Sequence, residues 1–181
     1  MDIHVALLRG INLGGKNRLS MKDLAAMFAD AGCTSVVTYI QSGNVVFNAS
    51  PALARRIPAR IEKAIADRFG YQIPVVTRTA GELHKVVRGN PFLRAGADPG
   101  TLHVAFLAGS PAAARVKALD PDRSPPDAFV VRGREIYLHC PNGFARTKLT
   151  NAYFDSKLAT MTTVRNWKTV ETLVELLTGH A

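Results

Sequence analysis

Glycines, amides and basic side chains are concentrated in one short segment near the start of the sequence. The segment runs from Arg9 to Asn17 and reads RGINLGGKN. Glycines allow backbone amide groups to turn inward, and a lysine adds positive charge, so this composition suits a phosphate or another anion. The alternative is a glycine loop that only shapes the entry of the chain into the next helix.

The stretch from Gly10 to Lys16 also has the spacing of the P-loop of nucleoside triphosphatases. In that motif a serine or threonine follows the lysine and binds magnesium, whereas this chain has Asn17. The next helix is expected to start only after Ser20, and the P-loop fold needs parallel strands that the pattern below does not predict. We therefore do not expect a true P-loop.

Two further segments carry polar groups. Gln41 to Asn44 places amide and hydroxyl groups in one turn, where they could bind a ligand or satisfy the backbone of the turn itself. Near the end of the chain, basic residues between Arg146 and Lys168 accompany Trp167. Basic groups beside an aromatic ring suit a nucleotide or a nucleic-acid strand, although a tryptophan also often anchors a helix against the core.

Residues with the usual catalytic or metal-binding arrangements are not apparent. The five histidines lack metal-ligand spacing, and no pair of carboxylates stands out. Cys33 and Cys140 have no catalytic context and are expected to be small buried hydrophobic residues. We predict no metal site and no particular cofactor or catalytic residue, so any catalysis would depend on positioning and electrostatics.

The spacing of apolar residues predicts the helices and strands on which these segments lie. Residues 3–8 predict a buried strand, and Ser20 is the expected N-cap of a helix. Residues 36–40 and 45–47 predict an antiparallel hairpin around the second polar segment. A helix from Ser50-Pro51, which Pro58 interrupts and Gly70 ends, then leads to a strand at residues 71–77. This order is the split βαβ pattern of ferredoxin-like folds.

The rest of the sequence predicts a second half of similar order. Thr79 and Glu82 form a capping box for a short helix, and residues 101–108 predict a strand. A helix capped by Ser110-Pro111, a hairpin at residues 129–131 and 135–139, and helices after Asn151 and Asn166 follow. We predict an α+β fold of two similarly built halves, residues 1–90 and 91–181, with mainly antiparallel sheets and helices packed on them as one globule.

Composition limits the possible environments and partners. The 181 residues include 23 basic and 14 acidic ones, which gives a net charge of +9 and a positive field that attracts phosphates, nucleic acid or acidic membranes. Two cysteines are too few for a secreted disulfide framework, and no apolar run approaches the length of a membrane span. We expect a soluble cytoplasmic protein with no membrane partner.

The polar segments also carry a family resemblance. The sequence contains LLRGINLGGKNRLSM, TYIQSGNVVF, IPVVTRT, TKLTN and TVRNWKTVETL, in that order. It resembles a bacterial family known as domain of unknown function 1697, which implies an α+β fold and no established activity. The resemblance implies three motifs. The first comprises Arg9, Asn12, Gly14, Gly15, Lys16 and Asn17, the second Gln41, Ser42, Gly43 and Asn44, and the third Lys148, Thr150, Asn151, Arg165, Asn166 and Trp167.

These observations predict a polar, positively charged cleft between the halves, where the three motifs meet and bind an anionic small ligand. A nucleotide or another phosphorylated metabolite fits this description, because hydrogen-bond donors recognise oxyanions. One alternative is nucleic-acid binding through the basic surface. The other is a protein-interaction module without a ligand. The sequence leaves the oligomeric state open.

Overall fold

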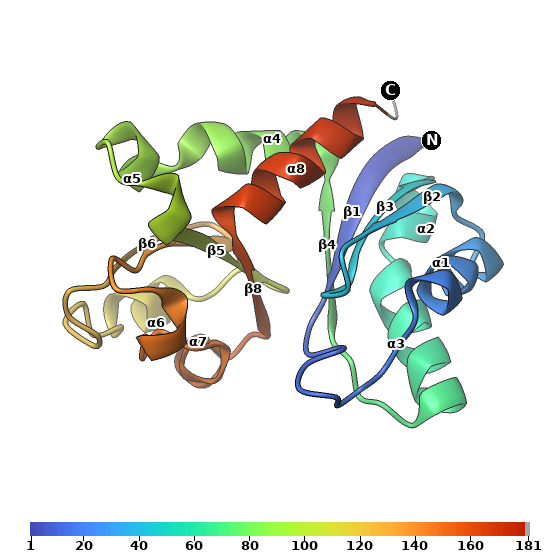
Figure 1. The fold of residues 1–181 in the computed structure, drawn as a ribbon, viewed down its shortest axis with the longest axis horizontal. Helices are drawn as coiled ribbons and strands as arrows, with labels where there is room; N and C mark the ends of the chain where they lie inside the picture. Colours follow the sequence, from blue (N-terminus) through green and yellow to red (C-terminus); the bar gives the residue numbers. More distant parts are fainter. Residues whose placement is uncertain (180–181) are drawn as a thin grey trace. The chain divides into compact units, whose positions relative to one another are not determined.

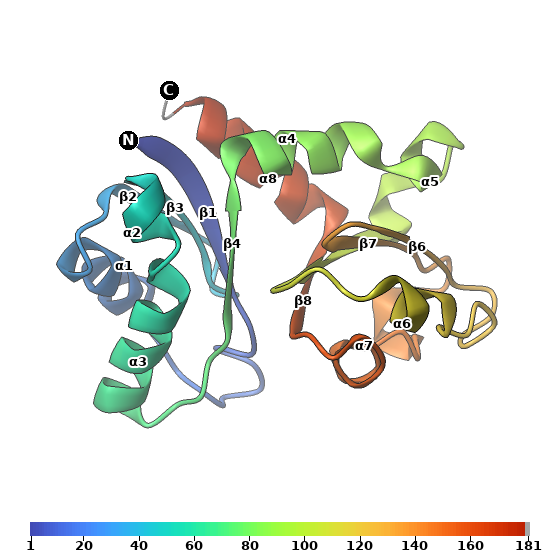
Figure 2. The same ribbon diagram turned by 180° about the vertical axis from the view of Figure 1, so that it is seen from behind.

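The computed structural model describes residues 1–179 and has the predicted α+β fold (Figures 1 and 2). It contains two four-stranded antiparallel sheets, with strand orders β2-β3-β1-β4 and β6-β7-β5-β8. The described chain divides into two compact units, residues 1–84 with 173–179 and residues 85–172. The predicted boundary after residue 90 stays a prediction.

The first unit is a ferredoxin-like sheet covered on one face by helices. Its strands are β1 (Asp2–Leu8), β2 (Thr34–Tyr39), β3 (Asn44–Ala49) and β4 (Val75–Thr79), and its helices are α1 (Met21–Asp30), α2 (Pro51–Ala54) and α3 (Ile57–Phe69). The core between them contains Leu8 and Phe47 from the sheet, Phe28 from α1, and Ile61 and Ile65 from α3. The two views agree that α1, α2 and α3 lie on the same side of this sheet.

The ends of these helices follow local sequence signals. Ser20 caps α1, since its Oγ accepts a hydrogen bond from the amide of Asp23 at 3.0 Å. Pro58 lies at the start of α3, as the sequence indicated, and Gly70 ends α3 in the left-handed conformation at φ 72°. The predicted capping box precedes α4 (Ala80–Gly89), where the amide of Thr79 donates to Glu82 Oε2 at 2.8 Å.

The second unit repeats this arrangement. Its strands are β5 (Leu102–Leu107), β6 (Ala128–Arg132), β7 (Glu135–His139) and β8 (Thr162–Asn166). Its helices include α5 (Pro91–Arg94), α6 (Ala113–Lys117) and α7 (Asn151–Leu158), with two single-turn 3-10 helices at Pro99–Thr101 and Phe144–Arg146. The final helix, α8, spans Trp167–Thr178. The second core packs Phe154 and Leu158 of α7 against Leu107, Ile136 and Leu138 of the sheet.

The structure reveals a residue-level repeat between the two units. β1 contains His4-Val5-Ala6-Leu7-Leu8 and β5 contains His103-Val104-Ala105-Phe106-Leu107, so four of the five residues are identical. An arginine pairs with the valine of each segment, because Val5 faces Arg78 and Val104 faces Arg165. Equivalent residues thus occupy equivalent strand positions in the two sheets.

Two predicted elements were wrong in detail, and one strand was missed. The fourth strand begins at Val75 rather than Tyr71, because Pro74 has no N–H and the amide of Val75 donates to Glu62 Oε1 at 2.9 Å. Helix α6 begins at Ala113 after Ala112, not at Ser110-Pro111. β8 was not predicted as a strand at all, because its sequence TTVRN is mostly polar although three of its side chains are buried.

Candidate functional site

The glycine loop is held by the side chain of Asn12. Its Nδ2 donates to the carbonyl oxygens of Leu19 at 2.9 Å and Gln41 at 2.8 Å, while its Oδ1 accepts from the amide of Leu19 at 2.9 Å. Asn12 adopts φ 54°, a left-handed conformation that asparagine tolerates. This residue therefore closes the loop and joins it to the second motif, 29 positions away in the sequence.

The tip of the loop is a small turn closed on itself. The amide of Lys16 donates to Leu13 at 2.9 Å, and Asn17 Nδ2 donates to the carbonyl of Gly10 at 2.9 Å. Gly14 and Gly15 at the tip have φ values of 55° and 78°. The sheet that supports the loop is antiparallel, so this loop is not the P-loop of a parallel-stranded nucleoside triphosphatase.

The second motif forms the turn between β2 and β3 and packs on the end of β1. Asn44 Nδ2 donates to the carbonyl of Tyr39 at 3.0 Å and to Ser42 Oγ at 3.1 Å, and the carbonyl of Gly43 accepts from the amide of Leu8 at 2.8 Å. A Cβ atom at Gly43 would lie 2.7 Å from Ile11 Cδ1. Only glycine fits this contact without displacement of a neighbour.

The first two motifs line a common pocket. Its volume is about 430 Å³, within the range of small-molecule sites. The lining residues are Asn12, Gly15, Arg18, Leu19, Ser20, Asp23, Gln41 and Phe69. The structure therefore brings together the glycine loop and the Gln41 turn, which are two of the three motifs that the sequence predicted to meet.

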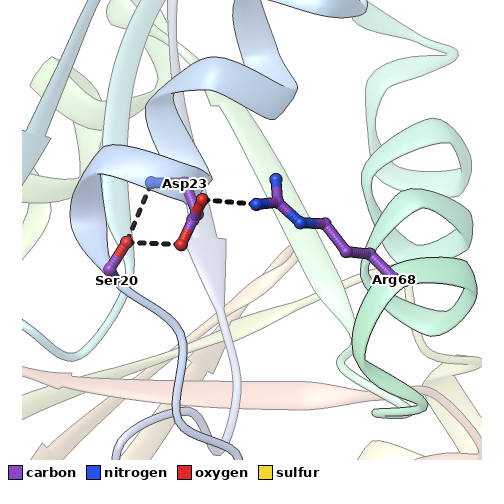
Figure 3. A network of polar contacts seen from close by, with 3 residues as sticks. All are labelled: Ser20, Asp23 and Arg68. Atoms are coloured by element: carbon purple, nitrogen blue, oxygen red, sulfur yellow. Dashed lines mark hydrogen bonds and ion pairs between the residues drawn. The ribbon is translucent and has the colours of Figure 1, made fainter.

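A polar network borders this pocket (Figure 3). Ser20 Oγ donates to Asp23 Oδ2 at 2.7 Å, and Arg68 Nη2 of α3 lies 2.8 Å from Asp23 Oδ1. The hydrogen bond from Ser20, with Arg68 as a further cause, lowers the pKa of the Asp23 carboxyl from its ordinary value. The one carboxylate of the pocket is thus ionised and engaged by its neighbours.

Two basic side chains lie at or near the pocket. A Cβ placed on Gly15 would lie 3.9 Å from Arg18 Nη2, so the guanidinium lies beside the tip of the loop. Lys16 and Arg18 are exposed, and within residues 1–179 neither forms an ion pair. The side chain of Gln41 is exposed as well.

The third motif lies in the second unit and contributes mainly to its folding. Thr150 caps α7, and Asn166 Oδ1 accepts from the amide of Thr169 at 2.8 Å at the start of α8. Asn151 Oδ1 accepts a hydrogen bond from Thr162 at 3.2 Å. The side chain of Lys148 is exposed. The predicted meeting of this motif with the first two stays a prediction.

Two residues of the third motif are buried. Trp167 is fully buried and presents no exposed ring face for base stacking, in agreement with its alternative role as an anchor. Arg165 Nη1 donates to Thr163 Oγ1 and to the carbonyl of Val164, both at 2.9 Å. Burial lowers the pKa of the Arg165 guanidinium to about 10, so it stays charged at neutral pH.

The two thiols and the possible metal ligands were located in the described part of the chain. Cys33 and Cys140 are both buried and unpaired with each other, as expected, and burial raises the pKa of each thiol to about 11. Residues 1–179 hold no cluster of three histidine, cysteine or acidic side chains suited to a metal ion. The helices of this part of the chain are also too short or too polar to cross a membrane.

Comparison with known proteins identifies the family. The sequence profile of the family described as "Protein of unknown function (DUF1697)" matches residues 1–137. The chain belongs to this family. A solved structure of a conserved bacterial protein from Streptococcus pneumoniae has a TM-score of 0.74 and 20% sequence identity, over 97% of this chain and 98% of that one. That likeness shows the same fold, and no curated protein matches the sequence.

The DUF1697 match includes the two motifs at the pocket and ends before the third motif. Five pocket residues were not predicted as site residues, namely Arg18, Leu19, Ser20, Asp23 and Phe69. Arg18 could have been found, because it directly follows the glycine motif. Ser20 and Asp23 were recognised only as a helix start, and Phe69 only as part of an apolar helix stripe.

Proposed function

We propose that the first unit of this chain binds a small anionic ligand, such as a nucleotide or another phosphorylated metabolite, in the pocket between the glycine loop and the Gln41 turn. The observation that supports this proposal is that two separated polar motifs line one pocket of about 430 Å³ beside Arg18, which forms no ion pair within residues 1–179. We therefore expect the ligand to bind next to Arg18.

The charges around the pocket favour an anion. Asp23 is engaged by Ser20 and Arg68, so its negative charge is largely balanced. Arg18 and the nearby Lys16 then supply unbalanced positive charge at the mouth of the pocket. A guanidinium binds phosphate oxygens in a planar, two-pronged geometry, which makes Arg18 the main expected contact.

The same pocket offers groups for the uncharged part of a ligand. Leu19 and Phe69 give apolar walls, and the Phe69 ring is supported by Tyr71, with ring centroids 5.7 Å apart. The exposed amide of Gln41 can both donate and accept hydrogen bonds. A ligand that combines a phosphate with an organic group therefore fits the lining better than a simple anion.

Calorimetric titration tests this function. Inorganic phosphate, AMP, ATP and several sugar phosphates are titrated into the full chain at low salt. We expect saturable binding of at least one organic phosphate, and Arg18→Gln should weaken it by about tenfold or more, as for loss of a charged hydrogen bond.

The matched control is Arg55→Gln, which removes the same charge from an exposed position of the first unit outside the pocket. It should retain binding within about a factor of two. Absence of binding by every compound, or equal loss in both variants, would contradict a site at Arg18. The second result would indicate a general attraction to the basic surface instead.

A further inference from the structure

The outer strand β2 of the first sheet contains no charged residue. β2 lies at the end of the order β2-β3-β1-β4, so one side of its backbone has no partner strand in this sheet. No charged residue occurs between Asp30 and Arg55, although charged residues make up 20% of the chain. Of the other end strands, β6 carries the exposed Arg132, whereas Arg78 of β4 and Arg165 of β8 are buried. β2 therefore lacks the charge that commonly prevents edge strands from pairing.

Exposed apolar side chains gather at the same edge. Val37 of β2 is 36% exposed, Ile40 after β2 is 47% exposed, and Leu13 of the glycine loop is 62% exposed. The bond from Asn12 Nδ2 to the Gln41 carbonyl places the loop that carries Leu13 next to the turn that carries Ile40. We call Leu13, Val37 and Ile40 the β2 edge patch.

Ile40 is held in an unfavourable backbone conformation. Its φ is 49°, in the left-handed region that β-branched residues rarely adopt. Asparagine or glycine would relieve this strain, and an exposed isoleucine gains nothing from the core. An apolar side chain at a strained, exposed position indicates a use for that side chain outside the fold of the single chain.

We propose that β2 pairs antiparallel with β2 of a second copy of this chain, giving a weak symmetric homodimer. Two identical uncharged strands are self-complementary about a two-fold axis. Each copy carries +9, so two copies repel least where their edges carry no charge, whereas an acidic partner would favour a basic edge.

The shape of β2 limits the extent of the pairing. A register irregularity lies between Thr34 and Val37, and regular pairing with β3 runs only from Val37 to Tyr39. The straight part of the edge is therefore short and lies beside the β2 edge patch. Such a contact buries less than a standard interface, so we expect a dissociation constant in the micromolar range or weaker.

Sedimentation velocity of the full chain, from micromolar to near-millimolar concentration, tests this pairing. We expect a concentration-dependent monomer–dimer equilibrium. Val37→Lys should raise the dissociation constant by about tenfold or more, because it brings like charges together across the two-fold axis. Gln72→Lys adds the same charge at an exposed site outside β2 and should leave the equilibrium unchanged.

Ile40→Asn provides a second test, and this variant is expected to be more stable than the original chain rather than less stable. Relief of the backbone strain should raise the melting temperature by about 2–4 °C, while loss of the apolar side chain should weaken the dimer. A chain that stays monomeric at every concentration, or a dimer that Val37→Lys and Ile40→Asn leave unchanged, overturns the proposal.

Discussion

At the scale of single residues, the asparagines and Gly43 of the first two motifs hold the backbone of their own loops. Asn12, Asn17 and Asn44 each donate to main-chain carbonyls of their own loops. These bonds are the ones expected if the polar residues satisfy their own turns, and ligand contacts by the same side chains stay a prediction. Their rigid loops in turn hold Arg18 and Gln41 at the pocket.

Gly43 offers a sharp test of this supporting role. Gly43→Ala places a Cβ at φ 85° and within 2.7 to 2.8 Å of Ile11 and Leu8. We expect a loss of about 2–5 kcal/mol in the free energy of unfolding, from backbone strain plus steric overlap, measured by urea denaturation.

Gly70→Ala is the matched control in the same unit. Gly70 has φ 72°, and no atom lies within 4 Å of its added Cβ. It should lose only about 1–2 kcal/mol, the cost of the left-handed conformation. Equal losses in the two variants would show that the Gly43 turn does not pack tightly on Leu8 and Ile11.

At the scale of elements, the first strand of each sheet carries a histidine at the same position. Burial lowers the pKa of His4 in β1 and of His103 in β5 below the ordinary value of 6.5. For each histidine, the unfolded chain then binds more protons than the folded chain at pH values between the lowered pKa of the folded state and the ordinary pKa of the unfolded state. The stability contributed by the neutral imidazoles is present above about pH 6.5 and is lost as the pH falls.

We therefore expect the free energy of unfolding to decrease as the pH is lowered from 7 to 5. His103→Phe should reduce this slope, because phenylalanine keeps the aromatic contact with Phe144, whose centroid lies 4.5 Å away, but does not titrate. Denaturant unfolding at several pH values measures the effect. If the unfolding free energy of this variant changes with pH as steeply as that of the original chain, the result would contradict a lowered pKa of His103 in the folded state.

Regular apolar patterns made most elements predictable. Leu24, Met27 and Phe28 gave the face of α1, and the capping box at Thr79 and Glu82 gave the start of α4. β8 could not be found this way, because Thr162, Thr163 and Arg165 are polar residues buried by tertiary contacts. Local sequence carries no signal for a strand whose burial depends on the rest of the fold.

At the scale of the whole molecule, each of the two units has the ferredoxin-like strand order, and the aligned segments of β1 and β5 share four residues. The order of elements predicted this likeness, but the identity became clear only when strand register aligned His4 with His103. The candidate site shows the same limit. Its two motifs were predictable from the sequence. Phe69 was not predictable as a pocket residue, because it reaches the pocket only through the packing of α3.

The net charge of +9 gives the chain a general attraction for anions, whereas the proposed function requires binding at one place. In that proposal, the glycine loop and the Gln41 turn form one binding pocket. Amide chemical-shift mapping of the full chain by NMR, with AMP and inorganic phosphate as separate probes, distinguishes the two.

We predict saturable shifts at the amides of Gly15, Arg18 and Gln41 with AMP, with a change at Phe69 that inorganic phosphate does not reproduce. Shifts confined to exposed lysines and arginines elsewhere, with these four amides unchanged up to saturation, would contradict the pocket as a ligand site.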